Sequence, residues 1–398
     1  MTANRYAARM DVVRPSAIRD LLEHAADPDI ISFGGGYPDP ALFPTAQLRE
    51  IYERILGGED RSPMQYTVTD GLPSLRRAIA ARMVADGVAC GTNDVIVLQG
   101  AQQGLSLVAQ MLIDPGDVIV VEDPTFLGAM LAFNPCQPAY APVRTDDDGL
   151  DPDDLERVLA ANPSAKFLYT MPDFHNPMGV SMSLERRRRV IEIANRYDLV
   201  VLEDSPYRQL RFEGETLPSL KSLDTEGRVI FLGSFSKTLV PGMRLGWAVA
   251  DPAFIGRIGL LKTAADTQTS TLNMAAAAAF LERFDLDAHI AEVNAVYRRK
   301  RDLMLGVMDE LFPPSVEFTR PEGGLFTWLT FPDGFDATAF MRDRALPEAK
   351  VAFVPGATFF ATDQQPNHAR LNYSGVSDER ITVGITRLGE LLRVALPG

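Results

Sequence analysis

Residues 233–247 read "GSFSKTLVPGMRLGW" and follow directly on the apolar residues "VIFL" at 229–232. Two serines, Ser234 and Ser236, precede Lys237, and Arg244 comes seven residues after that lysine. A lysine at the end of a buried strand, close to another cation, is typical of a Schiff-base nucleophile. Desolvation and a neighbouring positive charge lower its pKa and make the free amine available. The stretch therefore predicts a reactive amine beside an anion-binding group.

Composition places the chain among soluble enzymes of ordinary type. It has 398 residues, enough for a large domain and a smaller one, and 46% of them are hydrophobic. Its net charge of -14 makes nucleic acid and anionic membranes poor partners. Cys90, Cys136 and the four scattered histidines have no metal-ligand spacing, so we expect no metal site. Without a signal core or an apolar span, the chain is predicted to be cytoplasmic.

Short apolar runs alternate with helical patterns through the middle of the chain. The runs cover residues 94–100, 117–124, 165–174, 199–207, 228–237 and 244–251. The clearest helical patterns between them cover residues 101–113, 151–161 and 183–197. The runs are apolar on both faces, which is typical of strands in a sheet covered by helices on both sides. The pattern predicts an α/β domain with a mostly parallel sheet.

The order of helical and strand-like patterns changes after about residue 290. A long charged helix is followed by strand-like pieces at 316–331, 351–360 and 368–374. A closing helix follows Ser377, a residue type that caps helix N-termini. This order predicts a second, smaller α+β domain.

Several candidate site residues follow the apolar runs. In parallel sheets, ligands bind beyond the carboxyl ends of the strands, where these residues are expected to lie. They are Ala101, Gln102 and Gln103 at a helix start, then Phe126, Asn176, Asp204, Tyr207, Ser234, Ser236, Lys237 and Arg244. A carboxylate that closes an apolar run, as Asp204 does, needs a cation or a donor beside it. Any one of these residues has an ordinary structural explanation, but their convergence at one sheet edge favours a site.

One cofactor would use every one of these groups. The sequence shows no Ser-His-Asp order and no GxGxxG after the first strand. Pyridoxal 5'-phosphate (PLP) carries an aldehyde, a phosphate, a ring nitrogen and a ring hydroxyl. The predicted contacts are an imine on Lys237, the phosphate on Ser234, Ser236, Arg244 and the helix start at Ala101 and Gln102, the ring nitrogen on Asp204, the ring hydroxyl on Asn176 and Tyr207, and the ring face on Phe126.

Five segments resemble the class I/II aminotransferases of PLP fold type I. They are "GSFSKTLVPGMRLGW", "PDFHNPMGVSMSLERRR", "VLEDSPYRQLRF", "QYTVTDGLPSLRRAI" and "RLNYS". The resemblance runs from about residue 10 to the C-terminus, and residues 16–44 are most similar to the 2-aminoadipate and kynurenine aminotransferase branch. It implies the aspartate aminotransferase-like fold, with a mostly parallel seven-stranded sheet. The expected division is 1–45 (a segment covering the site, part of the small domain), 46–288 (large domain) and 289–398 (small domain).

The resemblance also implies residue roles. Lys237 would be the Schiff-base lysine, acting with Asp204 and Tyr207. Tyr66 would reach the cofactor phosphate of a neighbouring subunit, which makes the enzyme a homodimer. Arg370 would clamp the substrate α-carboxylate, while Gly36 would let substrate lie against backbone.

Three positions differ from the residues common in this family. Position 101 is alanine rather than serine, position 126 is phenylalanine rather than tyrosine, and position 175 is histidine rather than glutamine. We expect these departures to affect substrate preference and to leave the core chemistry unchanged.

The expected reaction is transamination between an L-α-amino acid and a 2-oxo acid such as 2-oxoglutarate or pyruvate. The donor would be of the 2-aminoadipate, glutamate, aromatic or branched-chain type. Arg19 is either the ligand of a distal carboxylate or a surface residue, and Tyr37 and Phe33 would shape a larger apolar pocket. Ser16 and Asn273 are weaker candidates for that pocket.

Two other functions stay open at this point. One is a PLP-dependent lyase, decarboxylase or oxidase, because PLP chemistry depends on which Cα bond stands perpendicular to the ring. The other is a regulator without catalysis, which the absence of a helix-turn-helix pattern in residues 1–45 disfavours.

Overall fold

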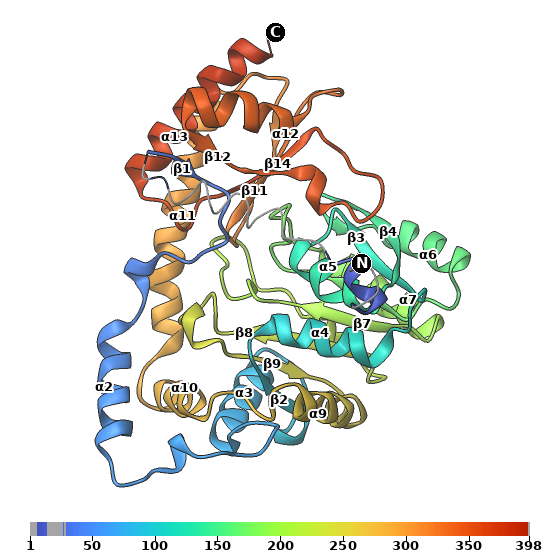
Figure 1. The fold of residues 1–398 in the computed structure, drawn as a ribbon, viewed down its shortest axis with the longest axis vertical. Coiled ribbons are helices and arrows are strands. Elements are labelled where there is room, and N and C mark those ends of the chain that lie inside the picture. The colour runs from blue at the N-terminus through green and yellow to red at the C-terminus, as the bar shows by residue number, and fades with distance from the viewer. Residues whose placement is uncertain (1–5, 14–26, 28, 397–398) are drawn as a thin grey trace.

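The structure is a computed structural model, and it describes residues 6–13, 27 and 29–396. Within these residues the largest sheet has eight strands in the order β2-β9-β8-β7-β6-β3-β4-β5. Figure 1 shows this sheet and its helices below a second group of strands and the C-terminal helix. The strands are β2 (Val95–Leu98), β3 (Val118–Asp123), β4 (Ala139–Asp146), β5 (Gly149–Leu150), β6 (Phe167–Thr170), β7 (Val200–Asp204), β8 (Val229–Ser234) and β9 (Gly246–Val249).

The middle of the sheet is parallel. The pairs β7–β8, β6–β7, β3–β6 and β3–β4 are parallel, while β9 is antiparallel to both β8 and β2. β5 is a two-residue edge strand, antiparallel to β4. The predicted mostly parallel sheet of seven strands is therefore confirmed in its main part, and β5 extends it by one short strand.

Among the described strands of the large sheet, β4 is the long one that the pattern of apolar runs does not predict. Its burial alternates along the chain, with Ala141, Val143 and Thr145 buried and Arg144 exposed between them. The strand lies next to the sheet edge, where one face is less completely covered. A half-buried strand alternates instead of forming a continuous apolar run, so the criterion used for the central strands does not detect it.

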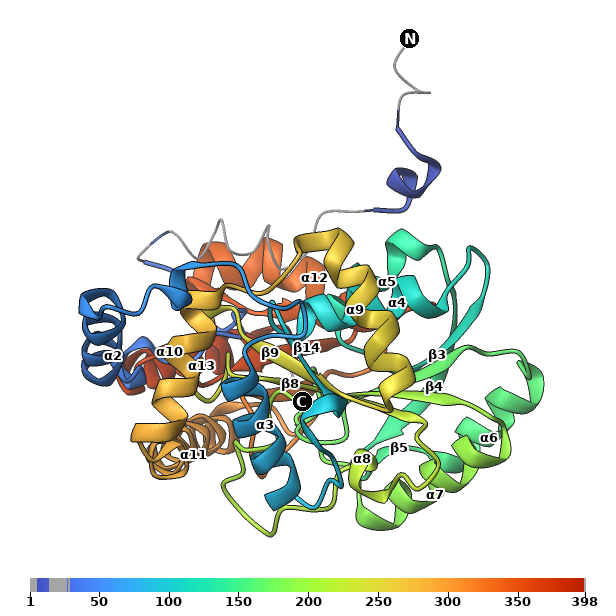
Figure 2. The ribbon, with the colours of Figure 1, turned by 90° about the horizontal axis from the view of Figure 1, so that it is seen from below.

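Helices cover both faces of the sheet. In β2, Ile96 and Leu98 belong to the buried cluster under α4, α5 and α9, while Val95 and Val97 belong to the cluster under α3 and α10. Farther along the sheet, α6 and α7 cover that second face, and Figure 2 shows them on the side opposite α4, α5 and α9. The helices are α2 (Thr45–Gly57), α3 (Pro73–Ala85), α4 (Ala101–Leu112), α5 (Leu127–Phe133), α6 (Pro152–Ala161), α7 (Leu184–Arg196), α8 (Leu220–Leu223), α9 (Pro252–Asp266) and α10 (Thr271–Arg283).

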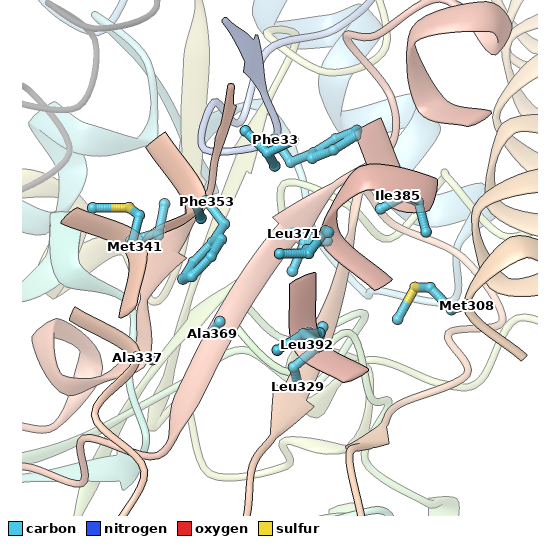
Figure 3. Close-up of a cluster of buried hydrophobic side chains, with 14 of the residues drawn as sticks. Phe33, Met308, Leu329, Ala337, Met341, Phe353, Ala369, Leu371, Ile385 and Leu392 are labelled. Carbon is cyan, nitrogen blue, oxygen red and sulfur yellow. The ribbon is translucent and has the colours of Figure 1, made fainter. Parts of the chain in front are cut away.

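A four-stranded sheet forms a second core near the C-terminus. Its order is β10-β11-β14-β13, and the short parallel pair β1–β12 lies beside it. Figure 3 shows Phe33 in this core together with Leu371 and Ile385. The prediction that Phe33 shapes the substrate pocket is wrong, because its ring packs within this core and against Gly384. The strands are β1 (Ile31–Ser32), β10 (Glu317–Phe318), β11 (Phe326–Thr330), β12 (Val351–Ala352), β13 (Val354–Pro355) and β14 (His368–Asn372).

The long helix α11 (Leu286–Leu311) connects the two parts. Its residues contribute to three buried clusters, from Leu286 at one end to Met308 at the other. Helices α12 (Ala337–Phe340) and α13 (Asp378–Ala395) complete the C-terminal part. The domain boundaries at residues 45 and 288 stay a prediction. Among the described residues, no helix is both long enough and apolar enough to cross a bilayer.

Candidate active site

Lys237 lies three residues beyond the end of β8, at the carboxyl edge of the large sheet. Its Nζ donates a hydrogen bond to the carbonyl of Gly36 at 2.8 Å and lies 5.9 Å from the centroid of the Tyr207 ring. Burial lowers the pKa of Lys237 to about 8, and the charges of Arg370 and Arg244 act in the same direction. At pH 7 about a tenth of this lysine is therefore a neutral amine, far more than for a lysine with its ordinary pKa of 10.5, as a nucleophile or base requires.

Asp204 ends the neighbouring strand β7 and is buried. The hydroxyl of Tyr169 donates to its Oδ2 at 3.1 Å, but Oδ1 has no hydrogen-bond partner among the described residues. Burial raises the pKa of Asp204 to about 7, although the Tyr169 hydrogen bond opposes the shift. A buried carboxylate oxygen without a partner is an acceptor waiting for a donor. A protonated ring nitrogen, as in PLP, fits this position.

Arg370 lies on β14 and is buried against two aromatic rings. Its guanidinium carbon is 4.2 Å from the centroid of Phe326 and 5.1 Å from that of Phe359. The Nη atoms donate to Asn176 Oδ1 and to the carbonyl of Gly34, both at 2.8 Å. Within the described chain its Nε has no partner. Burial lowers the pKa of Arg370 to about 10, so the side chain stays cationic at neutral pH.

Hydroxyls, a guanidinium and a helix start meet at the edge next to β8. Ser236 donates its backbone N–H to Ser234 Oγ at 3.1 Å, and Arg244 Nη1 donates to Ser236 Oγ at 3.4 Å. Helix α4 begins at Ala101 after Gly100, which has a φ of 77° and offers no side-chain cap. The positive φ of Gly100 is a conformation that L side chains rarely adopt, which favours glycine there, and the absence of a Cβ also lets Arg244 Nη2 approach the turn closely. We call Ser234, Ser236, Arg244 and the first N–H groups of α4 the phosphate cradle, because this group suits a phosphate.

Gln102 and Phe126 lie beside the cradle. Gln102 Nε2 donates to the carbonyl of Gly128 at 2.7 Å, which ties the start of α4 to the start of α5. A Cβ on Gly128 would lie 2.4 Å from the Phe126 ring, so glycine lets that half-buried ring pack against the backbone. The side chain of Gln102 is therefore engaged elsewhere, and only its backbone N–H is available to an anion.

Other predicted site residues are exposed, have structural partners or lie outside the described chain. Tyr37 is 55% exposed, and Tyr66 is 80% exposed on the surface of the single chain. Asn273 donates to the carbonyl of Met243 and accepts from the hydroxyl of Tyr52, so its side chain has a structural role. Arg19 and Ser16 lie outside the described residues.

Sequence reasoning missed the buried partners that hold the site. Tyr169 lies within the apolar run of β6, so nothing in the run itself marks it as the donor to Asp204. Glu122 accepts from the Thr170 hydroxyl and the Met171 N–H, both at 2.8 Å, and His175 Nε2 lies 3.2 Å from its Oε2. A glutamate near the end of a buried strand was the available signal, since buried carboxylates need several donors.

Residues 29–388 match the family model "Aminotransferase class I and II". The chain belongs to this aminotransferase family. It is 40% identical to aromatic-amino-acid aminotransferase 1 of Thermococcus litoralis, over 96% of this chain and 92% of that protein. It is 38% identical to the 2-aminoadipate transaminase of Thermus thermophilus, over 96% of this chain and 94% of that protein.

Solved structures of aminotransferases have the same fold. The kynurenine aminotransferase of Pyrococcus horikoshii, solved in complex with pyridoxamine phosphate, superposes with a TM-score of 0.94 at 37% identity, covering 99% of this chain and 98% of that one. An α-aminoadipate aminotransferase from Thermus thermophilus, complexed with N-(5'-phosphopyridoxyl)-L-leucine, gives 0.91 at 37% identity and 98% coverage of both chains. The chain is thus an aminotransferase of PLP fold type I, and PLP is its cofactor. The resemblance seen in the sequence is confirmed.

Proposed function

We propose that the enzyme transfers the amino group of an L-α-amino acid of the aromatic or 2-aminoadipate type to a 2-oxo acid such as 2-oxoglutarate or pyruvate. The relatives named above, at 40% and 38% identity, are named for aromatic amino acids and for 2-aminoadipate. The observation that carries the proposal is the convergence of Lys237 with two buried polar atoms, Asp204 Oδ1 and Arg370 Nε, that have no partner among the described residues. Asp204 Oδ1 would accept a hydrogen bond from the ring nitrogen of PLP, and Arg370 Nε would donate one to the α-carboxylate of the amino acid.

Lys237 acts as the base at the substrate Cα. PLP, when bound, withdraws electrons from the amino acid attached to it and so makes the Cα–H acidic. Nζ of Lys237 accepts this proton, because its lowered pKa of about 8 leaves it partly unprotonated near neutral pH. The Gly36 carbonyl, 2.8 Å away, then stabilises the ammonium that forms and keeps it near the site.

Asp204 would hold the ring nitrogen of PLP in its protonated state. Tyr169 fixes one carboxylate oxygen from β6, which leaves the other oxygen as the acceptor for a donor in the site. A cation beside a buried carboxylate favours its ionised form, so binding would lower the pKa of Asp204 from about 7. The Asp204 carboxylate would then be paired with an opposite charge and with a hydrogen-bond donor on each oxygen, as a buried ion pair requires.

Arg370 binds the α-carboxylate of the substrate. The two phenylalanine rings hold its guanidinium plane, and Asn176 and Gly34 hold its Nη atoms. The buried Nε without a partner is the donor that the substrate carboxylate would take up. A fixed guanidinium orients a carboxylate with little loss of side-chain entropy on binding.

The homodimer and the role of Tyr66 belong to this proposal. Large hydrophobic side chains more than half exposed are found between residues 56 and 68 and at residue 260, namely Leu56, Met64, Tyr66, Val68 and Leu260. Apolar side chains of this size on a surface favour an interface, here with a second copy of the chain. Analytical ultracentrifugation tests it, and a monomer that retains full activity would rule out a contribution from the partner's Tyr66.

A cytoplasmic location is also proposed. Cys90 and Cys136 are both unpaired in the structure, which is usual in a reducing compartment. Fractionation of the native host, followed by immunodetection of the chain, tests this location.

Absorption spectroscopy of the purified protein tests the reaction. Single amino acids are added one at a time, and loss of the visible imine band is followed. The proposal predicts bleaching by aromatic amino acids or 2-aminoadipate and recovery of the band on adding 2-oxoglutarate or pyruvate. Product formation without bleaching would favour a lyase or decarboxylase instead. Bleaching by none of these donors would reject the proposed substrate class.

A further inference from the structure

A partly buried cluster of polar side chains lies behind the phosphate cradle. Lys262, in the last turns of α9, is completely buried, and its Nζ donates to both carboxylate oxygens of Asp266 at 2.8 and 2.9 Å. The same Nζ donates to Gln103 Oε1 at 3.1 Å. Gln103 Nε2 donates back to Asp266 Oδ2 at 2.7 Å, which closes the triangle. We call Lys262, Asp266 and Gln103 the α9–α4 cluster.

The α9–α4 cluster continues into the turn that begins the cradle. Gln103 Oε1 also accepts the backbone N–H of Gln99 at 2.9 Å, so a side chain from the first turn of α4 reaches back to the residue before Gly100. The carbonyl of Gln99 in turn accepts from Arg244 Nη2 at 3.5 Å. One chain of contacts therefore runs from α9 through Gln103 to two components of the phosphate cradle, the start of α4 and Arg244.

The geometry gives a physical reason for burying a lysine there. Gln103 can accept from Gln99 and donate to Asp266 at the same time only if its amide is held in one orientation. Lys262 donates to the same Oε1, and Asp266 accepts from Nε2, so both ends of the amide are specified. Fixing the amide fixes the backbone between 99 and 101, where the positive φ of Gly100 leaves the turn otherwise free to rearrange.

We propose that Lys262, Asp266 and Gln103 are positioning residues for the cofactor phosphate, acting through the turn at 99–101 on the N–H groups of α4 and on Arg244. None of the three is proposed to touch the phosphate itself. The inference rests on the proposed assignment of the phosphate cradle. It predicts that changing these residues weakens binding of the cofactor only through its phosphate group.

The test compares two ligands that differ only in the phosphate. Full-length Lys262→Met is converted to the apoenzyme, and dissociation constants are measured for PLP and for pyridoxal. The expected result is PLP binding weaker by about tenfold or more, with pyridoxal binding unchanged. Unchanged PLP affinity would overturn the proposal. So would an equal loss for PLP and pyridoxal, because a general distortion of the site affects both ligands.

Gln103→Ala serves as a second variant if Lys262→Met does not fold. Alanine is compatible with the first turn of α4, and the same selective loss of PLP affinity is expected. Lys221→Met is the matched control, because Lys221 also pairs with a buried aspartate, Asp224, at 3.0 Å, and lies outside the cradle. Loss of PLP affinity in this control equal to that in Lys262→Met would overturn the proposal.

Arg244→Met separates this inference from the assignment on which it rests. If Arg244→Met weakens PLP binding and Lys262→Met does not, the cradle stands and the role of the α9–α4 cluster is rejected. If neither change weakens PLP binding, the assignment of the cradle is rejected as well. Selective loss in both variants is the expected result.

Discussion

The proposed cofactor side and the proposed substrate side of the active site are built in different ways. On the cofactor side, Asp204 and Ser234 each end a strand of one sheet, and Lys237 follows three residues later. On the substrate side, Arg370 bonds the carbonyl of Gly34 across 336 residues of sequence. The first arrangement is set by neighbouring parallel strands, and the second by the contact of two distant segments. Substitutions on the cofactor side should therefore lower the rate of amino-group exchange, and substitutions on the substrate side should weaken substrate binding.

The largest expected effect is that of Lys237→Ala. Removing the base at Cα should lower the rate of amino-group exchange by about 10⁴-fold or more. This is the upper end of the range for a general base, because Lys237 would also be the nucleophile that binds the cofactor. Rapid-mixing kinetics on the PLP-loaded protein measure the rate, and circular dichroism controls for folding. Exchange within tenfold of wild type would place the base elsewhere and remove the centre of the cofactor side.

Arg370→Lys tests the substrate side. Lysine keeps the charge but loses the fork held by Asn176 and Gly34, so KM for the amino acid should rise by roughly 10- to 100-fold. PLP affinity should change little. Steady-state kinetics and a PLP titration on one preparation separate the two quantities. The comparison between the two sides breaks down if PLP affinity falls as much as substrate affinity.

Asp204→Asn should have opposite effects on activity and on the stability of the cofactor-free protein. The folded-state pKa of Asp204, about 7, lies above its ordinary value of 3.8, so the folded apoenzyme binds more protons than the unfolded chain. Its stability should therefore fall as pH rises from about 4 to 7. Asparagine removes this penalty, and we expect about 1–3 kcal/mol greater apoenzyme stability at pH 8. Activity should fall in the same variant.

Urea unfolding of both apoenzymes at pH 5 and pH 8 measures the effect of Asp204→Asn. The stabilisation should be larger at pH 8 than at pH 5. Equal effects at the two pH values would mean that Asp204 is not held as a raised-pKa carboxyl in the folded state.

Tyr169→Phe should have the smallest effect. It removes one neutral donor from Asp204 without changing the shape of the core, so kcat should fall by about 2- to 10-fold. The pKa of Asp204 should rise further, since the Tyr169 hydrogen bond lowers it. Infrared spectroscopy of the carboxyl band in the apoenzyme follows that pKa. An unshifted carboxyl titration would leave Tyr169 as a packing residue alone.

The two sides also differ in how well the sequence predicted them. Lys237, Asp204 and Asn176 follow apolar runs, and their meeting follows from the rule that parallel strands end at one edge. On the substrate side, Phe33 was predicted to shape the pocket, and Asn273 was a weaker candidate for it. Phe33 lies in the core of the second sheet, and Asn273 bonds Tyr52 and Met243. No rule of periodicity separates an aromatic residue at a pocket from one in a core.

Supporting contacts that cross between distant segments were not predictable. Asp39 accepts from Lys300 Nζ at 2.6 Å and donates its N–H to the Tyr297 hydroxyl at 3.0 Å. These contacts with α11 hold the segment that brings Gly36 to Lys237. Each residue is an ordinary polar residue in its own local pattern, and only its distant partner gives it a role.

The sequence by itself determined the fold class and the cofactor, and it singled out the residues that we propose for the cofactor side. These depend on local patterns, namely buried strands, the residues that end them and a helix start. Only the tertiary structure decided that Tyr169 and Glu122 serve the site, that Gln103 links α9 to the cradle, and that Arg370 faces Asn176. The physical reason is that burial and hydrogen-bond pairing are properties of the packed chain. A side chain's partner is chosen when distant segments meet, and no local pattern records that meeting.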